Sequence, residues 1–260
     1  MNILVYADDI VIIGNTRDVL EKIYCKLVES LEKLKLIVNR SKSKCIVFDN
    51  SRYGNDIKEM KLGDDILECV TEYKYLGHIV QRNLEDTKDV ECKLPQFYSK
   101  FNVVLRKFNN VSTDAKFYLF NSYCLPEYGL ALWNIAELSK KHIFKVFRTA
   151  FHNAFKKISG ASFYHSSHDI AINCKQLLFE HYLPVVQARY FKRAMKSKNS
   201  LMTLCRPYLK AGYHMSAFCK ILRCSYSIGF MENDLDIIRA RISYVQKNET
   251  QTGLTYFLQE

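Results

Sequence analysis

Residues that interrupt regular structure are scarce in this chain of 260 residues, which holds only 9 Gly and 4 Pro. Its apolar runs are short as well, and stretches such as 10–13 and 130–133 fall far below the roughly 18 residues that a membrane-spanning helix requires. Asp8 and Asp9 break the first apolar stretch, so no secretory signal is expected. Hydrophobic residues nevertheless make up 48% of the chain, which excludes disorder and predicts a sizeable core without a membrane segment.

The nine cysteines are odd in number and scattered, which is not the pattern of a disulfide framework. A zinc module is not indicated either, because neither Cys219 with Cys224 nor the stretch 165–174 has the paired Cys-x-x-Cys spacing. We therefore expect an intracellular protein with reduced thiols. Nucleus and cytoplasm are not distinguished, since pairs such as Lys140-Lys141 are too short to indicate a nuclear signal.

The net excess of positive charge lies in the second part of the chain. Residues 1–95 carry 15 Lys and Arg against 17 Asp and Glu, whereas residues 96–260 carry 23 against 10, a net charge of +13. The bases alternate with aromatic residues in segments such as 144–148 and 189–193. Cations meet phosphates and rings stack on bases, so this pattern predicts a nucleic-acid partner. The alternative is a solvated helix face above a core of aromatic side chains.

The first third of the sequence predicts strands around one helix. We expect a hairpin of strands 2–6 and 10–13, then a helix capped by Asn15 or Thr16 that extends to Leu34. The further strands that we expect are 36–38 and 45–48, joined by a basic turn at 39–44, and then 66–70 with 73–80 as a second hairpin. Together these elements give an α+β fold class.

From about residue 86 the apolar residues recur at helical spacing. A helix is expected over 90–108, with Pro95 starting, kinking or breaking it, and the next helix is capped by Ser112 or Thr113. Later helices are expected over 139–158, ended by Gly160, and over 184–195 and 234–245. The predicted domains are therefore 1–85, with strands and one helix, and 86–260, basic, aromatic-rich and mostly α-helical.

Two adjacent carboxylates, Asp8 and Asp9, lie at the expected tip of the first hairpin. Neighbouring negative charges repel each other unless a cation lies between them and other partners. Mg²⁺ is a hard cation that takes carboxylate and phosphate oxygens, so the pair is a candidate metal site. The alternative is that acids simply tolerate the backbone of a turn.

The order and spacing of several sequence segments support the interpretation of Asp8 and Asp9 as a metal site. The segment Tyr6-Ala7-Asp8-Asp9 between apolar strands resembles the catalytic hairpin of reverse transcriptases, and four later segments resemble elements of the non-LTR retrotransposon enzymes in the same order. They are the basic turn and strand at 39–48 in the palm, Tyr75-Leu76-Gly77-His78 as the primer grip, 125–133 in the thumb, and the basic helix 147–160. The resemblance extends through about residue 205.

The resemblance implies a role for each matching residue. Asp8 and Asp9 would be catalytic and would bind Mg²⁺, with Mn²⁺ as an alternative, in a two-metal reaction. Lys42, or failing that Lys44, would place a positive charge beside the leaving pyrophosphate. The stretch Tyr75-Leu76-Gly77 would lay its backbone against the primer terminus, although the same residues would also suit an ordinary buried hairpin.

The helical domain would hold nucleic acid through basic side chains on the expected helix 139–158. The candidates are Lys145, Arg148, Lys156 and Lys157. The expected partners are an RNA template and a DNA primer, with no membrane.

The sequence also departs from the family. Reverse transcriptases need another metal-binding Asp on a strand before the hairpin, together with fingers, and no matching segment precedes Tyr6. We therefore expect a partial palm, primer grip and thumb of an RNA-directed DNA polymerase, inactive alone unless an upstream polymerase segment supplies the missing ligand. The alternatives are a non-catalytic nucleic-acid-binding module or a remnant without selected function. The role of the residues after about 205 stays open.

Overall fold

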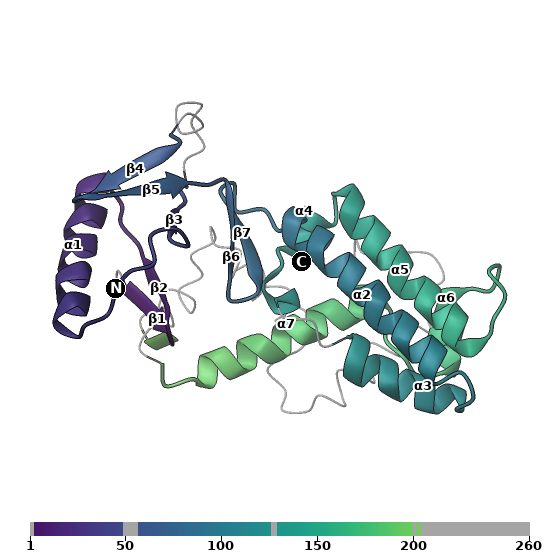
Figure 1. The fold of residues 1–260 in the computed structure, drawn as a ribbon. Coiled ribbons are helices and arrows are strands. Elements are labelled where there is room, and N and C mark those ends of the chain that lie inside the picture. The colour runs from purple at the N-terminus through teal and green to yellow at the C-terminus, as the bar shows by residue number, and fades with distance from the viewer. Residues whose placement is uncertain (1–2, 49–56, 126–128, 200–201, 204–260) are drawn as a thin grey trace. The chain divides into compact units, whose positions relative to one another are not determined.

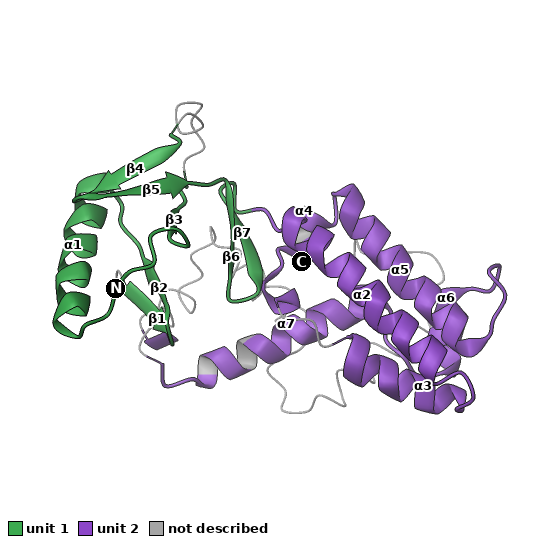
Figure 2. Cartoon of the chain, in the orientation of Figure 1, with its two compact units in different colours: residues 1–84 green, residues 85–260 purple. Residues whose placement is uncertain are grey.

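The computed structural model describes residues 3–48, 57–125, 129–199 and 202–203. Contacts divide the chain into unit 1, residues 1–84, and unit 2, residues 85–260 (Figure 2). Unit 1 combines short strands with one long helix, while the described part of unit 2 is helical (Figure 1). This mixture agrees with the predicted α+β class. Within the described ranges, no helix combines the length and the apolar character that crossing a bilayer demands.

Unit 1 contains three small sheets among its described residues. Its elements in chain order are β1 (Ile3–Tyr6), β2 (Asp9–Ile12), α1 (Arg17–Lys33), β3 (Lys44–Cys45), β4 (Glu59–Leu62), β5 (Asp65–Cys69), β6 (Glu72–Tyr75) and β7 (His78–Gln81). The pairs β1–β2, β4–β5 and β6–β7 are antiparallel hairpins, and β3 joins the free edge of β5 in parallel. Helix α1 packs on this three-stranded sheet through Tyr24, Leu62 and Leu67.

The sequence correctly predicts the first hairpin and the helix after it, and Thr16 caps α1 by accepting a hydrogen bond from the Val19 amide at 3.3 Å. Two other predictions for unit 1 are wrong. Residues 36–38 form no strand, and of the next predicted strand, 45–48, only Cys45 is paired, in the two-residue strand Lys44–Cys45. In addition, residues 66–70 do not pair with 73–80.

The true partner of β5 is β4, a short strand that the sequence analysis missed. In β4 the exposed Glu59 and Lys61 alternate with the half-buried Met60 and the buried Leu62, but a stretch of only four residues is too short to stand out as a strand. The segment 73–80 instead folds back on itself around the two-residue loop Leu76-Gly77. A loop of this length forces the strands on either side of it to pair with each other.

Unit 2 is built around a core of aromatic side chains. Its described elements are α2 (Thr87–Lys107), α3 (Thr113–Leu119), the π-helical turn η2 (Phe120–Cys124), the 3₁₀ turn η3 (Leu130–Leu132), α4 (Ile135–Leu138), α5 (His142–Ser159), α6 (Ser167–Asn173) and α7 (Phe179–Lys196). Phe97 on α2 and Phe151 on α5 lie at the centre, with ring centroids 6.3 Å apart and Phe120 edge-on to both. Buried rings in this arrangement contribute packing energy beyond their area.

Both prolines of the predicted helices lie inside longer helices, which corrects the sequence analysis. Pro95 neither starts nor breaks α2, and α7 begins at Phe179 rather than at Pro184. Each proline removes one backbone hydrogen bond, and burial of the flanking apolar residues keeps the helix continuous. The predicted caps are present, since Ser112 accepts from the Ala115 amide and Gly160, at φ 69°, ends α5. The predicted helix 234–245 lies outside the described residues.

A buried polar network fixes the lone tryptophan of the chain. Trp133 is fully buried, and its indole Nε1 donates to Asp89 Oδ2 at 2.8 Å. Asp89 in turn lies 3.8 Å from the ammonium of Lys93, and both side chains are buried. Gln187 Nε2 on α7 donates to the Trp133 carbonyl at 2.6 Å. The network therefore links α2, the segment after η3 and α7.

Replacing Asp89→Ala leaves a buried ammonium and an indole N–H without this carboxylate. We expect the free energy of unfolding to fall by about 3–5 kcal/mol, the usual cost of removing one partner of a buried ion pair. Urea unfolding followed by far-ultraviolet circular dichroism measures it. The double variant Asp89→Leu with Lys93→Met removes both charges and should regain part of the loss. A cost below about 1 kcal/mol for Asp89→Ala would show that the network is not structural.

Candidate functional site

The acid pair lies at the tip of the β1–β2 hairpin. Tyr6 pairs with Asp9, so the loop consists of Ala7 and Asp8 alone. Ala7 has a φ of 53°, in the left-handed region, which is the pattern of a type II′ turn. Asp8 and Asp9 are both exposed. The sequence prediction that the pair lies in a tight turn is therefore correct, with Asp9 as the first residue of β2.

The chemistry of this acid pair suits a hard cation. Two adjacent carboxylates offer oxygen ligands of the kind that Mg²⁺ prefers, so Asp8 and Asp9 fit as part of a metal site. Over the described ranges, no group of three or more His, Cys, Asp or Glu side chains could hold a metal ion. Because Mg²⁺ demands near-octahedral coordination, two carboxylates would leave most of its positions to water or phosphate oxygens. By itself the pair would therefore make only an incomplete metal site.

The basic turn 39–44 is organised by the side chain of Asn39. Its Oδ1 accepts hydrogen bonds from the Ser41 hydroxyl at 2.8 Å and from the Lys42 amide at 3.2 Å. The Asn39 carbonyl also accepts from the Ser43 amide at 3.0 Å. An asparagine that bonds to the backbone two or three residues ahead is a stable turn former. These bonds fix the backbone at Lys42.

The three cations of this turn differ in their partners. Arg40 Nε lies 2.6 Å from Asp65 Oδ1, and Lys44 Nζ lies 2.6 Å from Glu68 Oε2. Lys42 is exposed and takes part in no ion pair with another described residue. Its charge is therefore the one that remains available to a ligand.

The β6–β7 hairpin turns at Leu76 and Gly77, with Tyr75 paired to His78. Both loop residues have positive φ, 46° and 80°, which defines a type I′ turn. Glycine adopts this conformation without a steric penalty, while leucine does so against its preference. All four residues are half-buried.

A hydrogen bond joins this hairpin to the basic turn. The Tyr73 hydroxyl on β6 donates to the Lys42 carbonyl at 3.2 Å. The structure thus brings together Lys42 and the hairpin that carries the predicted primer-grip residues. Tyr73 was not singled out by the sequence analysis, because an exposed strand tyrosine gives no signal of its partner.

Asp65 is a second residue that the sequence analysis missed. It is buried, it accepts a hydrogen bond from Tyr24 on α1 at 2.6 Å, and it pairs with Arg40 in the basic turn. Burial, together with the bond to the Asp65 carboxylate, raises the pKa of Tyr24 well above its usual range. After Gly63-Asp64 an aspartate resembles an ordinary turn residue, so the sequence gives no sign of its burial.

The four predicted nucleic-acid contacts of α5 lie in unit 2 and fall into two classes. Lys145 and Lys157 are exposed and form no ion pair with another described residue. Arg148 lies 3.5 Å from Glu180, and Lys156 donates to the Phe163 carbonyl at 2.6 Å. Lys145 and Lys157 are therefore the stronger candidates for contact with a polyanion.

Glu180 at the start of α7 is the acid beside this basic helix. One oxygen of its carboxylate lies 3.0 Å from His152 Nε2, and the other lies next to the guanidinium of Arg148. Burial opposes its ionisation, but the bond to His152 and the charge of Arg148 outweigh burial and lower the pKa of Glu180. Burial lowers the pKa of the neighbouring His181, and His168 adds to this effect.

Comparison with known proteins gives two matches. The family described as Reverse transcriptase (RNA-dependent DNA polymerase) matches residues 1–80. The chain is also 26% identical, over 210 residues, to the RNA-directed DNA polymerase from mobile element jockey of Drosophila funebris. That alignment covers 76% of this chain and 22% of the relative, so the chain spans about a fifth of the relative's length. No solved structure matches the chain significantly.

We expect the free energy of unfolding to decrease on acidification in two steps. Because folded His181 has a lowered pKa, the unfolded state binds more protons once the pH falls through 6.5, and stability is lost there. The lowered pKa of Glu180 gives a second loss as the pH falls below 4.5. Urea unfolding at about pH 7.5, 5.5 and 4 measures both steps. His181→Gln should abolish only the first; an unchanged first step in that variant would contradict the assignment.

Proposed function

From the similarity to reverse transcriptases of non-LTR retrotransposons, which the comparisons confirm, we propose that this chain acts within an RNA-directed DNA polymerase. Residues 1–85 would provide part of the palm with the metal hairpin and primer grip, and residues 86–260 a basic thumb. The observation that carries the proposal is the exposed pair Asp8–Asp9 at the tip of a hairpin, where Asp8 lies in the two-residue loop and Asp9 begins β2. RNA template and DNA primer would be the partners.

The residues of unit 1 suit separate tasks in nucleotidyl transfer. Asp8 and Asp9 would hold Mg²⁺, which supplies activation of the primer 3′-hydroxyl and stabilisation of phosphate charge when bound. Lys42 offers an unpaired ammonium to the leaving pyrophosphate, whereas Glu68 already neutralises Lys44. The Leu76-Gly77 turn presents backbone with little side-chain bulk at Gly77, which allows a primer terminus to approach closely.

We further propose that the isolated chain polymerises very slowly or not at all. If two metal ions supply the chemistry of nucleotidyl transfer, they would need more protein ligands than the two carboxylates of Asp8 and Asp9. Another segment of the polymerase would supply the remaining ligands.

Primer extension on an RNA template tests this proposal with purified chain 1–260 in Mg²⁺ and, separately, in Mn²⁺. We expect no extension above that of the Asp8→Asn and Asp9→Asn variants. Extension by the unchanged chain that disappears in Asp8→Asn but survives in the matched variant Asp18→Asn, on exposed α1 surface, would overturn the proposal of inactivity. It would at the same time support Asp8 as a catalytic residue.

A second function is favoured by the charge of the helical unit. The 18 residues of α5 include four Lys or Arg and no Asp or Glu, and residues 96–260 carry a net +13. A helix of one charge sign attracts the phosphate backbone without reading base sequence. The chain would then act as a nucleic-acid-binding module, with or without polymerase activity.

Binding of a labelled duplex at a series of salt concentrations tests the second function. Affinity should fall linearly with salt on logarithmic axes, because each phosphate contact releases a condensed counterion. The double variant Lys145→Gln with Lys157→Gln should weaken binding and reduce the slope by about 2, one for each lost contact. Lys22→Gln, on the exposed surface of α1, is the matched control and should leave the slope unchanged. No binding at low salt would contradict the proposal.

A further inference from the structure

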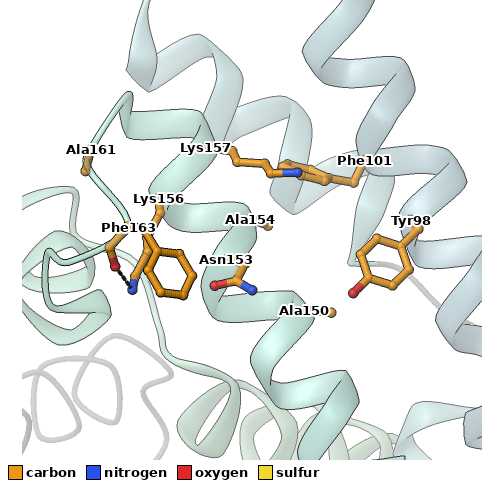
Figure 3. Close-up of a pocket in the computed structure, with 9 residues that line it drawn as sticks. All are labelled: Tyr98, Phe101, Ala150, Asn153, Ala154, Lys156, Lys157, Ala161 and Phe163. Atoms are coloured by element: carbon orange, nitrogen blue, oxygen red, sulfur yellow. Dashed lines mark hydrogen bonds between the residues drawn. The ribbon is translucent and has the colours of Figure 1, made fainter.

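A groove in unit 2 lies between α2 and α5 and is closed at one end by the loop after α5 (Figure 3). Its volume is about 350 Å³, near the lower end of the range for small-molecule sites. The floor is apolar and buried, formed by Phe101, Ala150 and Ala154. Such a floor accepts a flat apolar surface rather than a hydrated one.

Two exposed aromatic rings line the same groove. Tyr98 on α2 is 42% exposed, and Phe163 in the loop after α5 is 73% exposed. Lys156 holds the loop residue in place, because its ammonium donates to the Phe163 carbonyl at 2.6 Å and lies 4.8 Å from the centre of the Phe163 ring. Both rings are thus presented to solvent.

Polar groups in the groove are available to a ligand. Figure 3 shows the side-chain amide of Asn153 between the rings of Tyr98 and Phe163. This amide forms no side-chain hydrogen bond with another described residue, and neither does the Tyr98 hydroxyl. Lys157 lines the groove as well, is exposed, and forms no ion pair with a described residue. A ring stack, an amide and a cation are the groups that recognise a base and its phosphate.

We propose that this groove binds one unpaired nucleobase of a nucleic-acid strand, stacked on Tyr98 or Phe163, with the adjacent phosphate at Lys157. The proposal rests on the proposed nucleic-acid-binding function of unit 2 and adds that single-stranded segments are preferred. A duplex hides the faces of its bases within its own stack, so only an unpaired base can offer a face to these rings. Asn153 would bond to the edge of the base.

The test uses a single strand of about 12 thymidines with 2-aminopurine at its centre, titrated with the full chain at low salt. We expect the fluorescence of the 2-aminopurine to be quenched on binding, because stacking on a ring quenches it. Tyr98→Ala with Phe163→Ala should weaken binding of this strand roughly tenfold. It should leave the salt slope and the binding of a blunt duplex unchanged.

Two variants and two ligands serve as controls. Tyr98→Phe keeps the ring and should bind like the original chain, while Tyr118→Ala removes an equally exposed ring, 73% exposed on α3 and outside the groove, and should also have no effect. A strand of the same length with abasic sites throughout should bind the original chain about tenfold more weakly than the thymidine strand does, and it should bind the double variant no more weakly than the thymidine strand binds that variant. Free 2-aminopurine nucleoside should remain unquenched, because it has no phosphate to contact Lys157. Circular dichroism verifies that each variant folds.

The outcomes separate this proposal from the function on which it rests. If the chain binds neither strand nor duplex at low salt, the nucleic-acid-binding function itself fails. If it binds both, but the double variant and the abasic strand change nothing, the groove proposal alone is overturned. Equal quenching of the free nucleoside would overturn the assignment of the occupant to a strand.

Discussion

The carboxylate of Asp65 is buried in unit 1, where it accepts a hydrogen bond from Tyr24 on α1 and pairs with Arg40 in the basic turn. It therefore joins three separate segments: the helix, the strand β5 and the turn that carries Lys42. A buried carboxylate is stable only when such partners compensate for lost hydration. Without it the basic turn that carries Lys42 would have one fewer anchor.

In unit 2, the single helix α5 carries both core aromatic side chains and cations. The apolar face of α5 supplies Phe147, Phe151 and Phe155 to the core, so the cations interleaved with them in sequence must lie toward solvent or find local partners. Two of the four do find partners, and two do not. For the segment 144–148 on α5, the alternative of a solvated face above aromatic core residues is thus correct as a description of packing. It is compatible with binding, since the same face is what a polyanion would meet.

Local rules predicted what is local in this fold. The hairpin at Asp8–Asp9, the caps at Thr16 and Ser112 and the stop at Gly160 all depend on neighbouring residues, and all are present. The rules failed where tertiary packing decides. Pro95 remains inside α2 because buried neighbours on both sides, such as Val90 and Phe97, hold the helix to the core.

In the candidate site, too, the sequence predicts the local features but not those that depend on tertiary contacts. The types of residue in the metal hairpin and the basic turn could be read from the sequence, because the chemistry lies within a few consecutive positions. The distinction between Lys42 and Lys44 could not, since it depends on Glu68 from a strand more than twenty residues away. The groove of unit 2 could not be predicted from the sequence either. Tyr98, Asn153 and Phe163 meet only because α2 and α5 pack together.

The tips of the β1–β2 and β6–β7 hairpins each contain a residue other than glycine with positive φ, Ala7 at 53° and Leu76 at 46°. Such a residue costs of the order of 1 kcal/mol relative to its preferred conformation, and an isolated two-stranded hairpin is at best marginally stable. The rest of unit 1 must therefore stabilise the conformation of these two tips. A short synthetic peptide with the residues of the first tip would keep the two acids but lose the turn that sets them side by side.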